Sequence, residues 1–483
     1  MLTRLSATEL SAQIHARTVS CEEVTQAYLD RISAHDDTYG AYLKVDPALA
    51  LAEARKAQDL VDSGHAGPLT GIPVALKDNM STDGIETTCA SKILEGYIPP
   101  FDATVVARIK AAGGVVLGKT NLDEFAMGAS TETSAYRVTR NPWDITRSPG
   151  GSSGGSAVAV AAELAPVALG SDTGGSIRQP ASLCGIVGFK PTYGRCSRYG
   201  LIAFGSSLDQ IGPMARNVED AALLAEVVTG HDPMDSTSLR HAPISRAELK
   251  QGSLKGLKVG LPKEVFTDAI ESGVGDVLQA AIDKLTQQGV IFEEITLPSI
   301  NLGVTTYYII APAEASSNLA RFDGIRFGPR LEGSGHVGLV ERTRAELFGP
   351  EVRTRIMIGT YALSAGYYDA FYLRAQQVRA LMQREFEQAF QKYDVILTPT
   401  SPIPAFKIGE LNNDPLALKL LDVCTIPANM GGLPGISLNA GFTEGLPVGL
   451  QLLAPPLGDE KLLQVAYATE QVLVDDTRRP PIP

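Results

Sequence analysis

Serine residues that could carry out acyl transfer lie in two glycine-rich loops within residues 147–178. One glycine-serine loop reads Gly-Gly-Ser-Ser-Gly-Gly-Ser over 150–156, and a second reads Asp-Thr-Gly-Gly-Ser over 172–176. Glycine allows close backbone approach, and serine hydroxyls can act as nucleophiles or proton relays. Such runs are often flexible linkers, but residues 157–169 between the loops are apolar apart from Glu163, and this segment is about long enough for one helix and one strand. We therefore expect both loops to lie inside a folded core.

Other kinds of site also use glycine-rich loops, and the sequence argues against two of them. The phosphate-binding pattern G-x-x-x-x-G-K-[ST] is absent, and no second Asp-Thr-Gly supplies the partner carboxylate of an aspartic protease. Gly150-x-Ser152-x-Gly154 does match a nucleophile elbow, although Arg-Ser-Pro before it is a poor strand end. In that alternative, Ser152 is the nucleophile and a distant histidine is the base.

The general base has two candidates in the sequence. No histidine lies between residues 66 and 230, so a Ser-His-Asp triad would recruit His231, His241 or His336 from afar. Lys77 is the other candidate, because it ends a short apolar run that reads as a buried strand. A lysine acts as a base only when neutral, so desolvation must lower its free pKa of ~10.4.

In the lysine arrangement, Ser152 passes a proton between Lys77 and the nucleophile Ser176. The glycine-rich turn before Ser176 would expose successive backbone N–H groups, which can hold the oxyanion of an acyl-transfer intermediate. The residue types permit this chemistry alongside the histidine-dependent alternative. A lysine at a strand end is otherwise most often a solvated residue.

Composition narrows the class of protein. The 483 residues carry a net charge of −12, with 44% hydrophobic and 20% charged residues, which predicts a soluble globular chain that binds nucleic acid poorly by itself. Five scattered cysteines without a C-x-x-C pair indicate a reducing compartment. Neither a signal peptide nor an apolar run of ~18 residues is present, so we expect a cytoplasmic protein without membrane contact. Metal-binding patterns such as H-E-x-x-H are absent, so no metal site is predicted.

The elements that position these residues predict an α/β fold. Strands and helices alternate over residues 257–295, which is typical of a sheet with helices on both faces. We expect one large domain, 1–483, with a mixed central β-sheet, a core at 71–199 and N-terminal helices within 1–65 packed on it. The predicted helices are 20–32, 46–64, 105–112, 217–228, one ending near 288, 367–393 and 460–474. The predicted strands are 71–77, 115–117, 257–261, 290–295, 395–397, 436–438 and 448–452.

The two loops and the upstream lysine together resemble the amidase signature family. The motifs are S-P-G-G-S-S-G-G-S at 148–156 and G-S-D-T-G-G-S-I-R-Q-P-A-S at 170–182. The resemblance implies the amidase signature fold and a Ser-cisSer-Lys triad. In it, Ser176 is the nucleophile, Ser152 is the bridging serine after a cis peptide bond, and Lys77 is the base.

The same resemblance implies roles for the residues around the triad. Ser153 is expected to support the loop by hydrogen bonds, and Arg178 is expected to anchor it. The oxyanion hole would consist of the backbone N–H groups of Thr173, Gly174, Gly175 and Ser176.

Outside the core, the chain is similar to the glutamine-hydrolysing subunits of tRNA-dependent amidotransferases. The resembling runs are 307–324, 355–368 and 422–434. This similarity implies a free amino acid, glutamine, as the substrate. Arg355 is expected to bind the α-carboxylate of glutamine and Asp422 its α-ammonium group, while Tyr307 closes over the ligand, and the pocket is lined by Ser130 and Met127. An ordinary ion pair is the alternative interpretation of Arg355 and Asp422.

The resemblance also implies partners. Glutamine would be hydrolysed to glutamate and ammonia, and the ammonia would pass to a B-type subunit that binds tRNA. That subunit, with ATP and Mg²⁺, would convert Glu-tRNA(Gln) to Gln-tRNA(Gln), with Asp-tRNA(Asn) as a second candidate. A small C-type subunit would clamp the assembly, and this chain itself would need no cofactor. The alternatives are a stand-alone amidase acting on small amides and a non-catalytic scaffold.

Overall fold

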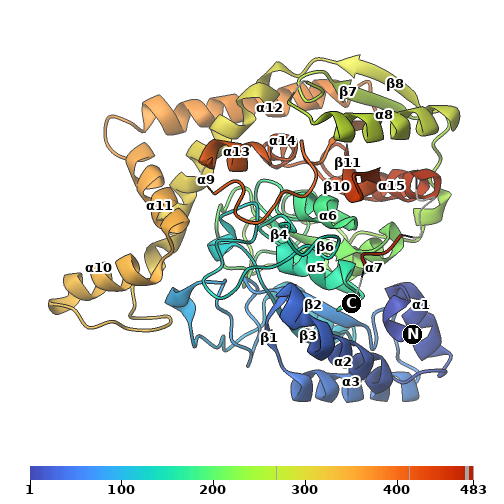
Figure 1. Ribbon diagram of the computed structural model, residues 1–483, viewed down its shortest axis with the longest axis horizontal. Coiled ribbons are helices and arrows are strands. Elements are labelled where there is room, and N and C mark those ends of the chain that lie inside the picture. The colour runs from blue at the N-terminus through green and yellow to red at the C-terminus, as the bar shows by residue number, and fades with distance from the viewer. Residues whose placement is uncertain (268, 413, 474–477, 482–483) are drawn as a thin grey trace.

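The computed structural model describes residues 1–267, 269–412, 414–473 and 478–481. These residues form a mixed sheet of 11 strands with helices packed on both faces (Figure 1). The strands are β1 (Tyr42–Val45), β2 (Pro73–Lys77), β3 (Val115–Thr120), β4 (Val167–Asp172), β5 (Val187–Lys190), β6 (Gln210–Ala215), β7 (Lys258–Pro262), β8 (Ile291–Ile295), β9 (Val395–Pro399), β10 (Gly435–Thr443) and β11 (Leu446–Leu453).

The helices between these strands account for most of the remaining described chain. They are α1 (Ala7–His15), α2 (Cys21–Tyr39), α3 (Pro47–Asp62), α4 (Thr104–Ala111), α5 (Gly154–Ala161), α6 (Arg178–Cys184), α7 (Val218–Val228), α8 (Ser272–Gln287), α9 (Gly303–Asn318), α10 (Gly335–Leu347), α11 (Pro350–Ala362), α12 (Arg374–Ala389), α13 (Pro415–Leu420), α14 (Ile426–Gly431) and α15 (Asp459–Leu473). In Figure 1, α10 and α11 project sideways from the body of the sheet.

Strands from both halves of the chain lie in the same sheet. The order is β1-β3-β2-β4-β6-β5-β10-β11-β9-β7-β8, so C-terminal strands β10 and β11 sit between β5 and the β9-β7-β8 group. Most apolar side chains from this sheet and its helices share one buried cluster. The predicted single large α/β domain with a mixed sheet is therefore confirmed.

The N-terminal helices pack over one edge of the sheet, as predicted. Ser20 caps α2 with a reciprocal bond to Glu23, and Asp46 caps α3, which has Pro47 at its first position. Helix α3 packs against β3 and helix α2 packs against α3. These contacts place both helices beside the β1-β3 edge (Figure 1).

Several elements were not predicted from the sequence. They are β1, β5, β6, α1, α6, α9, α10, α11, α13 and α14. Strand β6 reads Gln-Ile-Gly-Pro-Met-Ala and lies inside the sheet, where Pro213 pairs with Leu169. Proline is normally confined to strand ends and edges, so this segment lacked a strand signal.

Two long helices differ slightly from their predicted bounds. The predicted helix at 367–393 begins with a π-helical turn at Asp369–Leu373 and ends at Ala389. The closing helix ends at Leu473, and its predicted last residue, 474, lies outside the described residues.

None of the helices in the described part of the chain combines the length and apolar character that crossing a membrane requires.

Candidate active site

Lys77 and the second glycine-serine loop lie together at the carboxyl ends of two neighbouring strands. Strand β2 ends at Lys77 and runs parallel to β4, with Val74 opposite Val167. The carboxyl ends of parallel neighbouring strands emerge at the same edge, which is where α/β sheets place their ligand sites. The loop after β4, which carries Ser176, therefore starts beside Lys77.

The Lys77 side-chain nitrogen contacts two of the three serines of the first loop, Ser152 and Ser153. Its Nζ donates to the Ser152 hydroxyl at 2.7 Å, to the Ser153 hydroxyl at 2.8 Å and to the Ser171 carbonyl at 3.2 Å. The side chain is completely buried. Lys119 is also completely buried, but it pairs with a carboxylate at 3.1 Å, whereas Lys77 is held by hydroxyl and carbonyl oxygens.

Ser152 follows a cis peptide bond from Gly151, as the resemblance implied. The Ser152 carbonyl accepts the Asp123 N–H at 3.3 Å. A Cβ at Gly151 would lie 2.1 Å from Asp123 Oδ2, so only glycine allows this close approach. Ser153 precedes α5 and turns its hydroxyl to the Ser171 carbonyl at 3.1 Å, which ties the two loops together.

Ser176 lies in the turn between β4 and α6. Its carbonyl accepts the Ser153 N–H at 3.2 Å, and its side chain is 6% exposed. Within the described residues, the Ser176 hydroxyl makes no hydrogen bond to Ser152. Catalytic hydrogen bonds are often long before substrate binds, so this arrangement is compatible with a relay that forms in the substrate complex.

The turn before Ser176 presents a run of free backbone donors. In the described part of the chain, no backbone hydrogen bond uses the N–H groups of Thr173, Gly174, Gly175 or Ser176. Gly175 has a φ of +153°, and a Cβ there would lie 2.2 Å from the Thr425 hydroxyl. The predicted oxyanion-hole donors are thus together and uncommitted, which suits an anion-binding nest.

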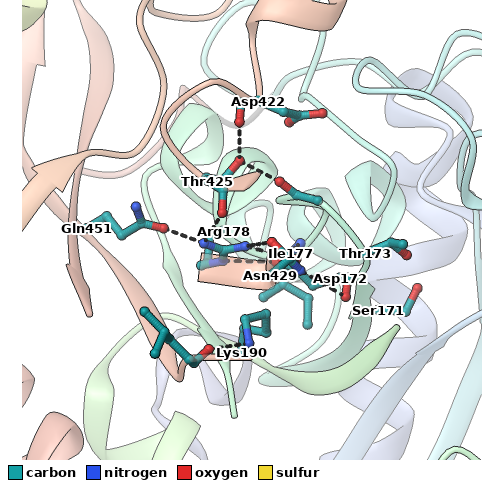
Figure 2. A network of polar contacts seen from close by, with 12 residues as sticks. Ser171, Asp172, Thr173, Ile177, Arg178, Lys190, Asp422, Thr425, Asn429 and Gln451 are labelled. Carbon is teal, nitrogen blue, oxygen red and sulfur yellow. Dashed lines mark hydrogen bonds and ion pairs between the residues drawn. The ribbon is translucent and has the colours of Figure 1, made fainter. Parts of the chain in front are cut away.

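Arg178 is fully buried next to this turn. Figure 2 shows it at the centre of a network of polar contacts. It binds the Asp172 carboxylate through two bonds, from Nε and Nη2, each 3.0 Å long. Although burial opposes ionisation, the Arg178 charge holds the pKa of Asp172 below its ordinary value. Asn429 and the Thr425 carbonyl accept further bonds from the guanidinium. These contacts account for an anchoring role and leave the guanidinium engaged within the protein.

Arg355, on α11, is buried among aromatic rings beside the turn. Its guanidinium carbon lies 5.5 Å from the ring centre of Phe204 and 5.1 Å from that of Tyr308. Its Nε donates to Glu351, one helical turn away, at 2.7 Å. That ion pair uses Nε, so the two terminal nitrogens remain for a second carboxylate.

Asp422, between α13 and α14, is buried on the Thr425 side of the network (Figure 2). Within the described residues, its Oδ1 has no hydrogen-bond partner. A Cβ on Gly175 would lie 3.0 Å from that oxygen, so it borders the predicted oxyanion turn. Burial first, and then the Asp172 charge, raise the pKa of Asp422 well above its ordinary value. A cationic ligand group there would satisfy this orphaned carboxyl.

Tyr307 was predicted to close over the ligand, and Met127 and Ser130 were predicted to line the pocket. The three residues occupy different positions. A Cβ on Gly174 would lie 2.9 Å from the Tyr307 ring, so that ring covers the turn. Met127 is fully buried in the same apolar cluster as Tyr307. Ser130 abuts the first loop, where a Cβ on Gly151 would lie 2.6 Å from its nitrogen. Their contact with a substrate stays a prediction.

Comparison with known proteins bears on this arrangement. A sequence profile described as Amidase matches residues 23–463. The chain belongs to the amidase family. Among curated relatives, the A-type subunit of glutamyl-tRNA(Gln) amidotransferase from Carboxydothermus hydrogenoformans is 57% identical over 469 residues, 97% of each chain. The corresponding protein from Moorella thermoacetica is 55% identical over 99% of this chain and 98% of its own.

Solved structures of amidase-family members have the same fold. The A-type subunit of glutamyl-tRNA(Gln) amidotransferase from Thermotoga maritima is 44% identical, with a TM-score of 0.83 over 100% of this chain and 99% of that one. The peptide amidase of Stenotrophomonas maltophilia is 32% identical, with a TM-score of 0.84 over 99% and 98% of the two chains. The predicted family and fold class are confirmed.

In this amidase-family chain, the candidate histidines lie away from the two loops. His231, His241 and His336 are exposed. Within the described residues, no histidine ring makes a hydrogen bond to Ser152 or Ser176. The geometry therefore favours the lysine arrangement over the histidine-dependent one. No cluster of three or more His, Cys, Asp or Glu side chains suited to a metal ion is found in the described ranges.

Sequence reasoning missed several residues of the amidase site. Glu351, Phe204 and Tyr308 around Arg355 were not predicted, nor were Asn429 and Thr425 around Arg178. The four-residue spacing of Glu351 and Arg355 is typical of a helical ion pair and was a usable signal. Tyr308, Thr425 and Asn429 lie within the resembling runs 307–324 and 422–434, but nothing in their local sequence indicated these contacts. Phe204 lies outside those runs.

Activity of this amidase-family chain should depend on pH through Lys77. Burial lowers the pKa of Lys77 to about 7, against nearby negative groups that raise it. Because only the neutral amine accepts a proton, kcat/KM should rise about tenfold per pH unit below that pKa and level off above it. A pH–rate profile measures this. A profile that is flat through pH 7 would contradict the assignment of Lys77 as the base.

Proposed function

We propose that this chain is the glutaminase subunit of a tRNA-dependent amidotransferase. It hydrolyses glutamine through an acyl-enzyme on Ser176 and supplies ammonia for converting Glu-tRNA(Gln) to Gln-tRNA(Gln). The observation that carries the proposal is the 57% identity, over 97% of both chains, to the A-type subunit of a glutamyl-tRNA(Gln) amidotransferase. The site geometry supports the chemistry that this relationship requires.

The acylation step follows from the contacts of Lys77. The neutral amine takes the proton of the Ser152 hydroxyl, which takes the proton of Ser176 as its oxygen attacks the amide carbon of glutamine. Negative charge on the former carbonyl oxygen is held by the N–H groups of residues 173–176. When the C–N bond breaks, the proton returns from Lys77 through Ser152 to the leaving nitrogen, and ammonia departs.

The second half of the reaction regenerates the enzyme. Lys77, neutral again, removes a proton from water through Ser152 while the water oxygen attacks the Ser176 ester. The same backbone donors hold the second oxyanion, and glutamate leaves as Ser176 recovers its proton. Each step moves one proton along one path, so a single amine serves both as base and as acid.

The polar groups beside the turn suit the amino-acid end of glutamine. The terminal nitrogens of Arg355 can bind both oxygens of an α-carboxylate, since guanidinium and carboxylate are matched in shape. The orphaned oxygen of Asp422 can accept from the α-ammonium group, and that charge would lower the raised pKa of the carboxyl. A pocket for a plain aliphatic amide has no use for either charge.

The partners follow from the same proposal. The net charge of −12 disfavours tRNA binding by this chain, so we assign the tRNA to a B-type subunit. ATP and Mg²⁺ are assigned to the same subunit, because this sequence has no phosphate-binding loop of the G-x-x-x-x-G-K-[ST] type. A small C-type subunit completes the assembly. Asp-tRNA(Asn) is a second acceptor to be tested.

The proposal is tested with the chain co-purified with its partner subunits. We expect kcat/KM for ammonia release to be higher with glutamine than with propionamide, and isotopically labelled amide nitrogen of glutamine to appear in Gln-tRNA(Gln). Faster hydrolysis of propionamide, without transfer of the label, would instead favour a stand-alone amidase. Running both Glu-tRNA(Gln) and Asp-tRNA(Asn) identifies the acceptor.

Arg355→Gln should raise KM for glutamine about 10- to 100-fold, because a hydrogen bond to a charged group contributes ~1.5–3 kcal/mol. The effect on propionamide, which has no carboxylate, should be small. Arg353→Gln is the matched control, since Arg353 is an exposed arginine on the same helix whose guanidinium binds the Ala345 carbonyl. Steady-state kinetics on both amides measure the difference, and an equal change in KM for both would contradict carboxylate recognition by Arg355.

A further inference from the structure

A short loop, residues 121–133, lies between the catalytic serines and the helix that carries Arg355. Within it, the Asp123 carboxylate accepts the Thr131 N–H at 2.9 Å, the Thr133 hydroxyl at 2.9 Å and the Ser130 N–H at 3.2 Å. The same carboxylate fills the space beside Gly151, where no Cβ fits. One side of this loop is thus fixed against the cis peptide bond before Ser152.

The next residue, Glu124, turns the other way. It is 2% exposed and binds two groups outside the loop. Its Oε1 accepts the Ser91 hydroxyl, and its Oε2 accepts the Gly349 N–H at 2.8 Å. A Cβ at Gly349 would lie 2.2 Å from Oε2, so glycine is needed for the carboxylate to come this close. Two adjacent acidic residues therefore hold two different parts of the site.

Gly349 is the residue from which α11 starts. It has no side chain to cap the helix, and Pro350 occupies the first helical position. The Glu124 side chain takes the place of a cap by accepting the Gly349 N–H at the helix N-terminus. A second contact joins the same segments, since the rings of Phe125 and Phe348 meet edge-on at 5.5 Å. The start of α11 is placed by the 121–133 loop.

We propose that Glu124 is a positioning residue for substrate recognition: it fixes the start of α11, and hence Arg355, relative to the loop that holds the catalytic serines. This inference rests on the proposed function, in which Arg355 binds the α-carboxylate of glutamine. Arg355 lies six residues, about one and two-thirds helical turns, beyond the contact with Gly349, so a shift of the helix start moves the guanidinium with it. Asp123 holds the same loop against the segment of Ser152. The loop therefore fixes the position of the start of α11 relative to Ser152.

Glu124→Gln in the assembled complex tests this role. The amide keeps the size of the side chain, and its NH₂ group can face only the Ser91 hydroxyl, which can accept a hydrogen bond, so the Gly349 N–H keeps only the weaker, neutral amide oxygen as its acceptor. We expect KM for glutamine to rise roughly tenfold, because a displaced Arg355 guanidinium forms weaker hydrogen bonds to the α-carboxylate of the substrate. The kcat for glutamine should change little. The kcat and KM for propionamide should also change little, because propionamide has no α-carboxylate for Arg355 to bind.

Glu470→Gln is the matched control. Glu470 is a mostly buried glutamate whose carboxylate accepts the Val218 N–H at 2.9 Å, at the first residue of α7. Helix α7 carries none of the proposed ligand residues, so this variant should keep KM for glutamine. Ser91→Ala, which removes only the other partner of Glu124, should also keep it. If Glu124→Gln does not fold, Glu124→Asp, which shortens the reach by one methylene, serves with the same expectation.

Three results would overturn the inference. One is an unchanged KM for glutamine in Glu124→Gln and Glu124→Asp. The second is an equal loss on both amides, which would show a general structural role, and the third is a rise of the same size in Glu470→Gln. Failure of the proposed function is separate, because it appears in the wild type as a lack of preference for glutamine. A rise in KM in Arg355→Gln but not in Glu124→Gln would reject the inference alone.

Discussion

Ser176→Ala should reduce glutamine hydrolysis by about 10⁴-fold or more while leaving the fold intact, because the acyl-enzyme cannot form without this oxygen. Within the described residues, the Ser176 hydroxyl makes no hydrogen bond, so its removal breaks no hydrogen bond that holds the fold. The variant should therefore keep its melting temperature within a few degrees. Ammonia release in the co-purified complex measures the loss, and calorimetry checks the fold.

The control for Ser176→Ala comes from the first loop. Ser156→Ala removes another buried hydroxyl, which donates to the Leu169 carbonyl at 3.0 Å and pairs with the Thr120 hydroxyl at 2.7 Å. That variant should lose some stability yet keep its kcat. Rapid quenching followed by mass spectrometry should find a glutamyl ester on Ser176 in the wild type. An ester on Ser152 would instead support the nucleophile-elbow alternative.

The residues of the proposed triad could be singled out from the sequence because they lie on short motifs, and the family resemblance then implied their roles. Lys77 ends an apolar run, and Ser152 and Ser176 lie in glycine-rich loops that flank a short helix and strand. Each of these signals is local, and the parallel pairing of β2 and β4 then brings the segments together. The direct contact of Lys77 with Ser153 could not be predicted from the sequence, because it depends on the orientation of the Ser153 side chain at the start of α5.

The support beneath the turn could not be predicted in the same way. Arg178 is held by Asn429, about 250 positions later in the chain, and by Gln451 on β11. Such contacts are set by the strand order of the sheet, which no local pattern encodes. Asp172, only six residues from Arg178, was the one partner within reach of sequence reasoning.

The helix of Arg355 was missed for a different reason. On α11, Met357 is 65% exposed and Tyr361 is 51% exposed, so apolar residues lie on its outer face as well as its inner one. An amphipathic helix is recognised by apolar residues spaced three to four positions apart on one face, and α11 does not show this pattern clearly. Arg355 was identified by resemblance, and its environment of Phe204, Tyr308 and Glu351 came only from the structure.

Lys77→Arg should reduce kcat by about 10³-fold or more, although it keeps a long cationic side chain at the position. A guanidinium stays protonated at any pH that the protein tolerates, so it cannot take the proton of Ser152. General-base catalysis contributes about 10²–10⁴-fold, and the lysine serves in both halves of the reaction. The residual activity should also lose the rise with pH through about 7, because the titrating amine is gone. A pH–rate profile of the variant tests both statements together.

Lys190→Arg separates catalysis from the general effect of changing a buried lysine. Burial lowers the pKa of Lys190 to about 7 as well, and its side chain is 1% exposed. Its nitrogen donates to the carbonyls of Pro191 and Leu433, with no serine among these partners. This variant should lose stability but keep the pH dependence of the wild type in its folded fraction. If instead Lys190→Arg removed the titration near pH 7 and Lys77→Arg retained it, the base would not be Lys77. A lowered pKa makes an amine able to accept a proton at neutral pH, and only contact with the two serine hydroxyls lets that proton come from a nucleophile.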